Sequence, residues 1–371
     1  MLKKGLALLS VRLFAVPVMA KRSGDIAEEP LKVRWYSGKS FRFAYSDAPE
    51  NRNKLSVAVF LLCRAPQAVP TIQMLNTLAA KYGDSINIAA ITPDHADDLK
   101  ALLSVIPAKG ISAGVDADRK LTANFMAGSP LYPMAFLSDA KGRLLWSGEA
   151  VDLGEVVSRC FDGKFDAKAA KKISPLLDEL HVCMRNNDDR KMNNLVQEIL
   201  SLDPGNAAAL RLRLFSLEQR NRSFEAWQLI YSELEKAPDI ARLYFTALDL
   251  VLRSRQLTGF LEKILAAFES NIRDAEHRAL MAYTLCERVE FNAAAVKMAD
   301  RLLKDIDTAK LKSPVDAVVF AAKASCAYRF CKLEDAVKFQ KKSLELWKRS
   351  GSEPNIRASQ ERLNYFISLG K

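Results

Sequence analysis

The chain has 371 residues, of which 49% are hydrophobic and 27% charged, so it is long and apolar enough for two domains with separate cores. Its formal net charge is +11, but the basic residues are spread among acids and no long basic run is interleaved with aromatic residues. This distribution predicts a solvated basic surface rather than nucleic-acid binding. Only three histidines occur and no histidine–cysteine cluster has zinc spacing, so we expect no metal and no other cofactor.

The first segment, residues 1–20, has the pattern of a signal peptide. Two lysines precede a mostly apolar stretch, and Val18-Met19-Ala20 offers small residues at the right places for cleavage before Lys21. An uncleaved membrane anchor is the alternative, but the apolar run is too short to span a bilayer and Arg12 would be costly inside lipid. We therefore expect a periplasmic or secreted protein without stable membrane insertion, which begins with a polar leader over residues 21–30.

Strand and helix patterns alternate between residues 31 and 165. A hairpin is expected around Ser37-Gly38, strands over 55–62, 86–91, 133–137 and 143–147, and helices over 71–82, 97–105 and 153–161. The runs at 55–62 and 86–91 are continuously apolar, as central strands buried on both faces require. This order of elements predicts a mixed sheet with helices on both faces.

From residue 166 to 371 the strand patterns disappear and helical periodicity continues. Pro204 and Pro238 lie 34 residues apart, each where a helix would stop. Ala226 and Ala294 lie twice that distance apart, and Ala336 follows after a short insertion. A small residue at these places would let two helices cross closely.

This register resembles tetratricopeptide (TPR) repeats, which implies four to five helix pairs stacked into a curved scaffold that binds peptides or partner proteins. The unit around Phe260 departs from the pattern, because it has a bulky residue at the small position and no closing proline. An irregular helical bundle with accidental spacing is the alternative.

Seven segments of the first half follow one another in a recognisable order. They are Leu31–Lys39, Val57–Phe60, Pro70, Asp116–Phe125, Pro133–Gly142, Trp146–Gly148 and Phe161–Asp166. In this order they resemble the thioredoxin-like domain of exported bacterial thiol–disulfide reductases, of the TlpA and redoxin group of the AhpC-TSA superfamily. The resemblance implies an α/β thioredoxin-like fold over residues 31–165, followed by an all-α, TPR-like domain over residues 166–371.

The redox motif of that family, W-C-x-x-C, does not occur in this sequence. The corresponding loop contains Cys63, and the resolving position three residues later is Pro66. If Pro70 fixes the alignment instead, the two cysteine positions become Leu62 and Ala65. In either alignment the second thiol needed to release a mixed disulfide is absent.

Three interpretations of Cys63 remain open. It could be a single nucleophilic thiol, activated by a helix N-terminus and by Arg64. It could also be a buried residue at the end of a strand without chemistry, or it could pair with a distant cysteine of the helical half. Six cysteines occur and their connectivity cannot be deduced from sequence.

Pro133 takes the place of the cis-proline of the resembled family. That resemblance implies that the backbone before it, here Tyr132, faces an extended substrate beside the redox loop. An ordinary trans-proline at the start of a strand is the alternative. Tyr132, Pro133 and Arg64 are therefore the candidate peptide-binding residues.

These observations favour a thioredoxin-fold protein that has lost its dithiol and binds proteins or extended peptides through a module joined to a TPR-like scaffold. The alternative is a thiol–disulfide oxidoreductase that uses Cys63 as a single thiol. A third possibility, a peroxidase-like thiol enzyme, is disfavoured because no threonine lies within the four residues before Cys63.

Overall fold

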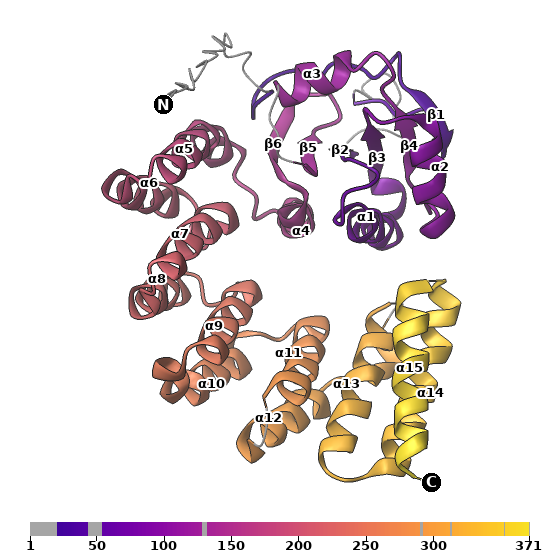
Figure 1. Ribbon diagram of the computed structural model, residues 1–371, viewed down its shortest axis with the longest axis vertical. Helices are drawn as coiled ribbons and strands as arrows, with labels where there is room; N and C mark the ends of the chain where they lie inside the picture. Colours follow the sequence, from indigo (N-terminus) through magenta and orange to yellow (C-terminus); the bar gives the residue numbers. More distant parts are fainter. Residues whose placement is uncertain are drawn as a thin grey trace, which may run out of the picture. The chain divides into compact units, whose positions relative to one another are not determined.

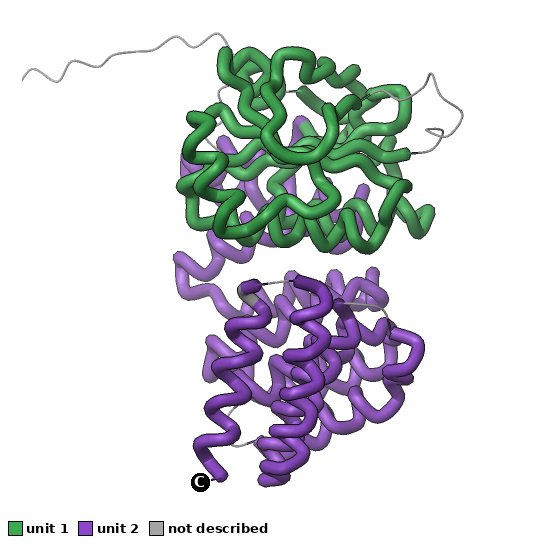
Figure 2. The backbone as a smooth tube through the Cα atoms, turned by 90° about the vertical axis from the view of Figure 1, so that its right-hand side faces the viewer, with its two compact units in different colours: residues 1–174 green, residues 175–371 purple. Residues whose placement is uncertain are grey.

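The computed structural model describes residues 21–43, 54–127, 132–289, 292–311, 314–351 and 353–370. The expected signal peptide, residues 1–20, lies outside them. The chain divides into two compact units, Met1–Ser174 and Pro175–Lys371 (Figure 2). We expected the boundary between residues 165 and 166, whereas the units divide within one helix, α5 (Ala167–Arg185). The first turns of this helix belong to unit 1, where Ala169 and Ile173 are buried.

Unit 1 contains a six-stranded sheet. Its strands are β1 (Arg34–Ser37), β2 (Leu55–Phe60), β3 (Ile86–Thr92), β4 (Ser112–Val115), β5 (Met134–Ser138) and β6 (Leu144–Glu149). Their order across the sheet is β1-β4-β3-β2-β5-β6. The central strands β2, β3 and β4 are parallel, and β1, β5 and β6 pair antiparallel with their neighbours. The mixed sheet inferred from the sequence is confirmed.

Helices cover both faces of this sheet. They are α1 (Ala68–Tyr82), α2 (Ala96–Val105), α3 (Lys120–Met126) and α4 (Leu153–Phe161). The alternate side chains Val57 and Val59 of β2 share one core with α1, α2 and α4, and the intervening Ala58 and Phe60 share the other core with Phe125 of α3. Figure 1 shows α3 on the opposite side of the sheet from α1 and α4. Unit 1 therefore has a thioredoxin-like fold.

The hairpin expected around Ser37-Gly38 is not formed, and this expectation was wrong. Strand β1 pairs with β4, so that Arg34 lies opposite Val115. The chain after Gly38 turns to bury Phe41 and Phe43 against α3. Strand β4 was missed because its four residues, Ser112–Val115, are too short for a periodic pattern and include a glycine.

Unit 2 and the helix that leads into it are entirely helical. The helices are α5, α6 (Asp189–Leu202), α7 (Ala207–Gln219), α8 (Ser223–Lys236), α9 (Ala241–Arg253), α10 (Leu261–Asn271), α11 (Ala275–Arg288), α12 (Ala293–Lys304), α13 (Val315–Arg329), α14 (Leu333–Ser350) and α15 (Glu353–Leu369). Short 3-10 turns, η4 (Arg255–Phe260) and η5 (Thr308–Lys310), interrupt the series. From α6 to α11, each helix packs on the one before or after it in the chain, and α13 packs on both α11 and α14.

The sequence signals for helix ends agree with the helices of unit 2. Asn206 and Asp274 accept hydrogen bonds from backbone N–H groups at the starts of α7 and α11, as N-cap side chains do. Pro204 and Pro238 each follow the end of a helix. No helix in the described part of the chain is long and apolar enough to cross a lipid bilayer.

Two of the three alanines expected at helix crossings are buried, as that expectation requires. Ala226 and Ala336 are completely buried on α8 and α14. Ala294 is exposed, and its neighbour Ala295 is buried on α12 instead, so the expected register was wrong there by one residue. The irregular unit around Phe260 explains the slip, because η4 replaces the start of its second helix and Phe260 stacks on Trp227.

Candidate functional site

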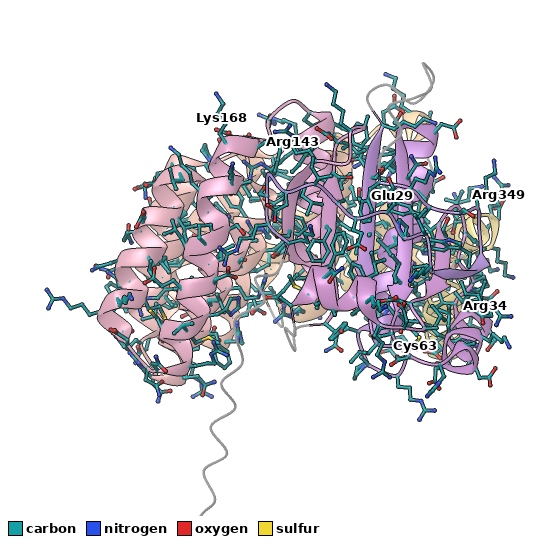
Figure 3. The ribbon with its side chains drawn as sticks, turned by 90° about the horizontal axis from the view of Figure 1, so that it is seen from above. Glu29, Arg34, Cys63, Arg143, Lys168 and Arg349 are labelled. Atoms are coloured by element: carbon teal, nitrogen blue, oxygen red, sulfur yellow. The ribbon has the colours of Figure 1, made fainter. Side chains whose placement is uncertain are left out.

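Cys63 lies in the loop between β2 and α1, just beyond the carboxyl end of β2 (Figure 3). Helix α1 begins at Ala68, with Gln67 as its N-cap residue, so the thiol is not at the helix N-terminus. The effect of a helix dipole falls off beyond the first turn, and the proposed activation by α1 is therefore wrong. The backbone N–H of Cys63 donates instead to Asp94 Oδ2 at 2.7 Å.

The surroundings of Cys63 stabilise the neutral thiol. Cys63 is only 8% exposed, and the pKa of its thiol is raised from 9.0 to about 11, with burial as the largest cause. The nearby carboxylates of Asp94 and Asp98 contribute to this rise, because a negative neighbour disfavours a thiolate. The side chain of Thr92 hydrogen-bonds to the thiol and acts in the opposite direction, with a smaller effect than burial. At neutral pH the thiol is protonated.

Arg64 is directed at Asp98 and not at the thiol. Its Nε and Nη2 atoms donate to Asp98 Oδ1 at 3.0 and 2.7 Å. The guanidinium side chain is 85% exposed, and its hydrogen bonds to Asp98 raise its pKa. Because Asp98 compensates its charge, Arg64 does not offset the acids around Cys63. The expected activation by Arg64 is therefore wrong as well.

The Tyr132–Pro133 bond is cis, as the sequence resemblance implied. Tyr132 is half-buried, and burial raises the pKa of its hydroxyl, with a further contribution from Asp94. Asp94 thus interacts with Cys63, with Arg64 and with Tyr132. The structure brings the sequence-predicted site residues together around this one carboxylate.

Asp94, Asp98 and Thr92 are the residues of this site that sequence reasoning missed. They lie at the end of β3 and the start of α2. Strands β2 and β3 are parallel, so the loops that follow them emerge at the same edge of the sheet. The acids after the apolar run 86–91 could have been placed beside Cys63 on this ground.

A third carboxylate, Asp116, holds the neighbouring segment in place. It is buried and accepts hydrogen bonds from the backbone N–H and the hydroxyl of Thr122, both at 2.7 Å. Its own backbone N–H donates to the carbonyl of Thr92. These contacts connect α3 to the end of β3 and make Asp116 a structural residue.

All six cysteines are free thiols, so Cys63 does not form the distant disulfide that the sequence left open. Among the described residues, no three or more His, Cys, Asp or Glu side chains are grouped so that they could hold a metal ion.

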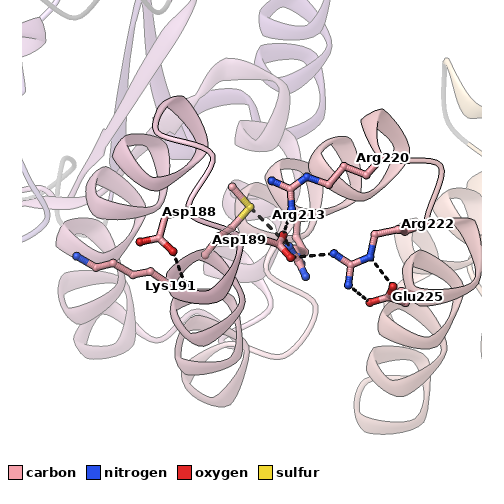
Figure 4. Close-up of polar contacts among 8 residues, drawn as sticks. Asp188, Asp189, Lys191, Arg213, Arg220, Arg222 and Glu225 are labelled. Atoms are coloured by element: carbon pink, nitrogen blue, oxygen red, sulfur yellow. Dashed lines mark hydrogen bonds and ion pairs between the residues drawn. The ribbon is translucent and has the colours of Figure 1, made fainter.

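A cluster of charges joins three helices of unit 2 (Figure 4). Asp189, at the start of α6, forms ion pairs with Arg213 of α7, with Arg220 at 2.6 Å and with Arg222 at 2.8 Å. Burial of Asp189 would raise its pKa, but the hydrogen bonds from Arg213 and Arg222 outweigh that effect and hold the pKa below its usual value. Since Glu225 also pairs with Arg222, the cluster is internally satisfied and is a structural network.

An apolar groove of about 830 Å³ lies between α13, α14 and α15. Its hydrophobic lining consists of Phe320, Leu333, Val337, Phe339, Phe366 and Ile367. The exposed lysines Lys338 and Lys341 also line it. Lys342, Glu334 and Glu345 line it too, and Lys342 pairs with Glu345. The groove therefore combines an apolar surface with charges of both signs, three lysines and two glutamates.

No known family description and no curated protein matches this chain. Nineteen chains of known structure do match. A secreted disulfide oxidoreductase of Mycobacterium tuberculosis is 16% identical, with 29% of this chain and 82% of that chain covered and a TM-score of 0.25. A peroxiredoxin Q variant of Xanthomonas campestris is 12% identical, with 38% of this chain and 98% of that chain covered and a TM-score of 0.30. A thiol–disulfide oxidoreductase of Bacteroides fragilis is 14% identical, with 34% of this chain and 96% of that chain covered and a TM-score of 0.25.

Proposed function

We propose that this chain is a periplasmic thioredoxin-fold protein that has lost the dithiol of the resembled family and binds proteins or extended peptides, with TPR-like repeats as its scaffold. The observation that carries the proposal is the state of Cys63. A reductase needs an exposed thiolate that attacks and a second thiol that releases the product. Here the thiol is buried beside Asp94, with a raised pKa, and Pro66 occupies the resolving position.

The position of Tyr132 supports peptide binding at the same place. Tyr132 is half-buried at the start of β5, and it lies close enough to Asp94 for that carboxylate to affect its hydroxyl. A peptide that crosses this edge of the sheet would contact the ring of Tyr132 and the loop that carries Cys63 and Arg64. Binding at this place requires no thiolate.

The apolar groove of unit 2 is a second contact surface for a protein partner. We propose that it takes an amphipathic segment with acidic flanks, because Lys338 and Lys341 would pair with those acids while the apolar lining accepts the other face. A synthetic amphipathic helical peptide with glutamates beside a leucine stripe is the probe. Charge reversal of both lysines should weaken its binding, whereas Lys348→Glu on the same helix, outside the groove, should not. Equal binding of the peptide by the unsubstituted chain, the double-lysine variant and Lys348→Glu would show that the groove is not the binding site.

The pattern of residues 1–20 supports export to the periplasm. N-terminal sequencing of protein recovered from the producing cell tests this part of the proposal. A chain that begins near Lys21 is the expected result, and an intact Met1 in the cytoplasm would contradict it.

A disulfide-reduction assay separates the proposal from its alternative. The full chain should reduce insulin disulfides weakly or not at all beside an intact dithiol thioredoxin. Multiple turnover that is abolished by Cys63→Ser, and retained by Cys331→Ser, would establish the single-thiol oxidoreductase instead.

Peptide binding is measured separately on an array of unfolded peptide segments. Tyr132→Ala should weaken this binding and Cys63→Ser should leave it unchanged. Tyr36→Ala is the matched control, because Tyr36 is half-buried on the opposite edge strand β1. An equal loss for both tyrosine variants would show that the effect is structural.

A further inference from the structure

Two of the six cysteines lie side by side in unit 2, away from the site around Cys63. Cys286 is on α11 and Cys326 is on α13, and these two helices pack directly against each other. Both side chains are buried, at 3% and 4% exposure. Each thiol affects the pKa of the other, so the two sulfur atoms are neighbours. None of the other four cysteines is part of this contact.

Small buried residues lie on both of the helices that carry this pair. Fully buried alanines lie on both elements, Ala279 and Ala282 on α11 and Ala322 and Ala324 on α13. Small residues let helix axes approach, and a disulfide requires Cα atoms no farther apart than about 7 Å. Both cysteines are buried on helices that pack against each other, which is consistent with sulfur atoms within reach of one bond.

A small reagent has a route to Cys286. Cys286 lines a cavity of about 520 Å³, together with Tyr283, Glu287, Tyr328, Arg329 and Arg362. The interaction between the thiols raises the pKa of Cys286 and lowers the pKa of Cys326, because the thiol hydrogen of one stabilises the thiolate of the other. The pair therefore contains the more readily ionised thiol that exchange chemistry uses.

We propose that Cys286 and Cys326 are a dithiol that small disulfides oxidise to an intramolecular disulfide between α11 and α13. One protein thiolate attacks the reagent, whose S–S bond breaks, so that a mixed disulfide forms and one reagent thiol leaves. The second protein thiolate then attacks the protein sulfur of that mixed disulfide. The bond between Cys286 and Cys326 forms, the mixed disulfide breaks, and a second reagent thiol leaves. Both thiol protons of the protein end on the two released thiols.

The test uses the full chain and 2-hydroxyethyl disulfide, followed by alkylation, tryptic digestion and mass spectrometry. The cleavage sites around the pair are favourable, because trypsin releases Cys286 within Ala279–Arg288 and Cys326 within Ala324–Arg329. The expected product is these two peptides joined, with the loss of two hydrogen atoms. Cys331→Ser, which removes the exposed thiol near the end of α13, should give the same product, and Cys286→Ser should not.

Recovery of Cys286 and Cys326 as separate alkylated peptides, under conditions in which Cys331 is fully modified, would overturn the proposal. So would separate mixed disulfides on the two residues. The decisive measurement is made on the unsubstituted chain, so it does not depend on the folding of a variant. The result is also independent of unit 1, because loss of reductase activity at Cys63 leaves this pair unchanged.

Discussion

At the scale of single residues, Cys63 decides whether unit 1 performs redox chemistry. Its pKa of about 11 leaves roughly a hundredfold less thiolate at neutral pH than a thiol with a pKa of 9.0. We predict that iodoacetamide modifies Cys63 much more slowly than the exposed Cys331 at pH 8, and that the rate rises steeply only as the pH approaches 11. Site-resolved mass spectrometry against pH measures both rates. Rapid modification of Cys63 at neutral pH would contradict the prediction.

A variant separates the two causes of the raised pKa. Asp94→Asn removes one negative neighbour but leaves the burial, which is the larger cause. The variant should therefore lower the pKa of Cys63 only part of the way toward its usual value. Asp97→Asn on the same helix start is the control, since Asp97 is exposed and pairs with Lys100. A complete return of the Cys63 pKa to its usual value in Asp94→Asn would show that the carboxylate, and not burial, is the main cause of the shift.

The residues expected to form this site can be located in the structure, but the chemistry expected of them differs from what the structure shows. Cys63, Arg64, Tyr132 and Pro133 lie near one another in the structure. The strands and loops that carry them could be inferred from the buried runs and turns of the sequence. The protonation state of Cys63 could not be inferred, since it depends on burial and on Asp94 from another loop. Contacts of this kind depend on tertiary packing, which no local pattern encodes.

Asp189 is the residue whose loss should most affect unit 2. It is the shared partner of Arg213, whose side chain is only 5% exposed, and of two further arginines. Asp189→Asn should lower the free energy of unfolding by about 1–3 kcal/mol, because a buried guanidinium loses its charged acceptor. Chemical denaturation measures the change, and the surface variant Asp300→Asn should change stability by less than about 0.5 kcal/mol.

The loss of stability caused by Asp189→Asn should depend on pH. Because the pKa of Asp189 is lowered in the folded chain, its contribution is fully present above the pKa of an unfolded aspartate, about 3.9, and is lost as the pH falls through the folded value. The difference between the original chain and Asp189→Asn should therefore shrink below pH 4. A difference that stays constant down to pH 2 would mean that charge is not its cause.

At the scale of elements, the helix crossings of unit 2 give a paired test. Ala226 is completely buried on α8, so Ala226→Leu should overpack the crossing and lower the free energy of unfolding by about 1–3 kcal/mol. Ala294 is exposed at the start of α12, so Ala294→Leu should have little effect. Thermal or chemical unfolding of the two variants measures both. Equal effects would mean that the observed register of these helices is wrong.

The elements that could be predicted are those with a long, regular pattern. The buried runs predicted β2 and β3 to within a few residues, and α4 was predicted with its observed bounds. Strand β4 is too short to show a periodic pattern, and the position of β1 depends on its pairing with β4. The pairing of these two strands therefore leaves no signal in the sequence of either segment. The slip from Ala294 to Ala295 has the same origin, because the irregular turn η4 shifts the spacing without changing the helical pattern.

At the scale of the whole molecule, α5 determines where the chain can be cut. Lys168, Lys171 and Lys172 lie within this helix, whereas Lys164 lies in the exposed turn before it. Since proteases need a locally unfolded substrate, we predict that limited trypsin treatment cleaves first after Lys164. Mass spectrometry of the early fragments identifies the site. Preferential cleavage after Lys168 or Lys171 would mean that the start of α5 opens readily.

The pairing of β1 with β4 sets the order in which the two units can fold. Arg34 of β1 cannot pair until Val115 of β4 is present, and the sheet is complete only when β6 has been synthesised. Most helices of unit 2, in contrast, pack against one of the next two helices in the chain. Local contacts form faster than distant ones. We predict that pulsed hydrogen exchange on the refolding chain protects amides of unit 2 before those of β1 and β4.

Simultaneous protection of both units would contradict this order.

Until the sheet is complete, the apolar strands Leu55–Phe60 and Ile86–Thr92 have unpaired edges, and such segments associate with one another. Aggregation during biosynthesis should therefore begin in unit 1. A holding chaperone would protect this protein best if it bound the nascent chain between the emergence of β2 and that of β6.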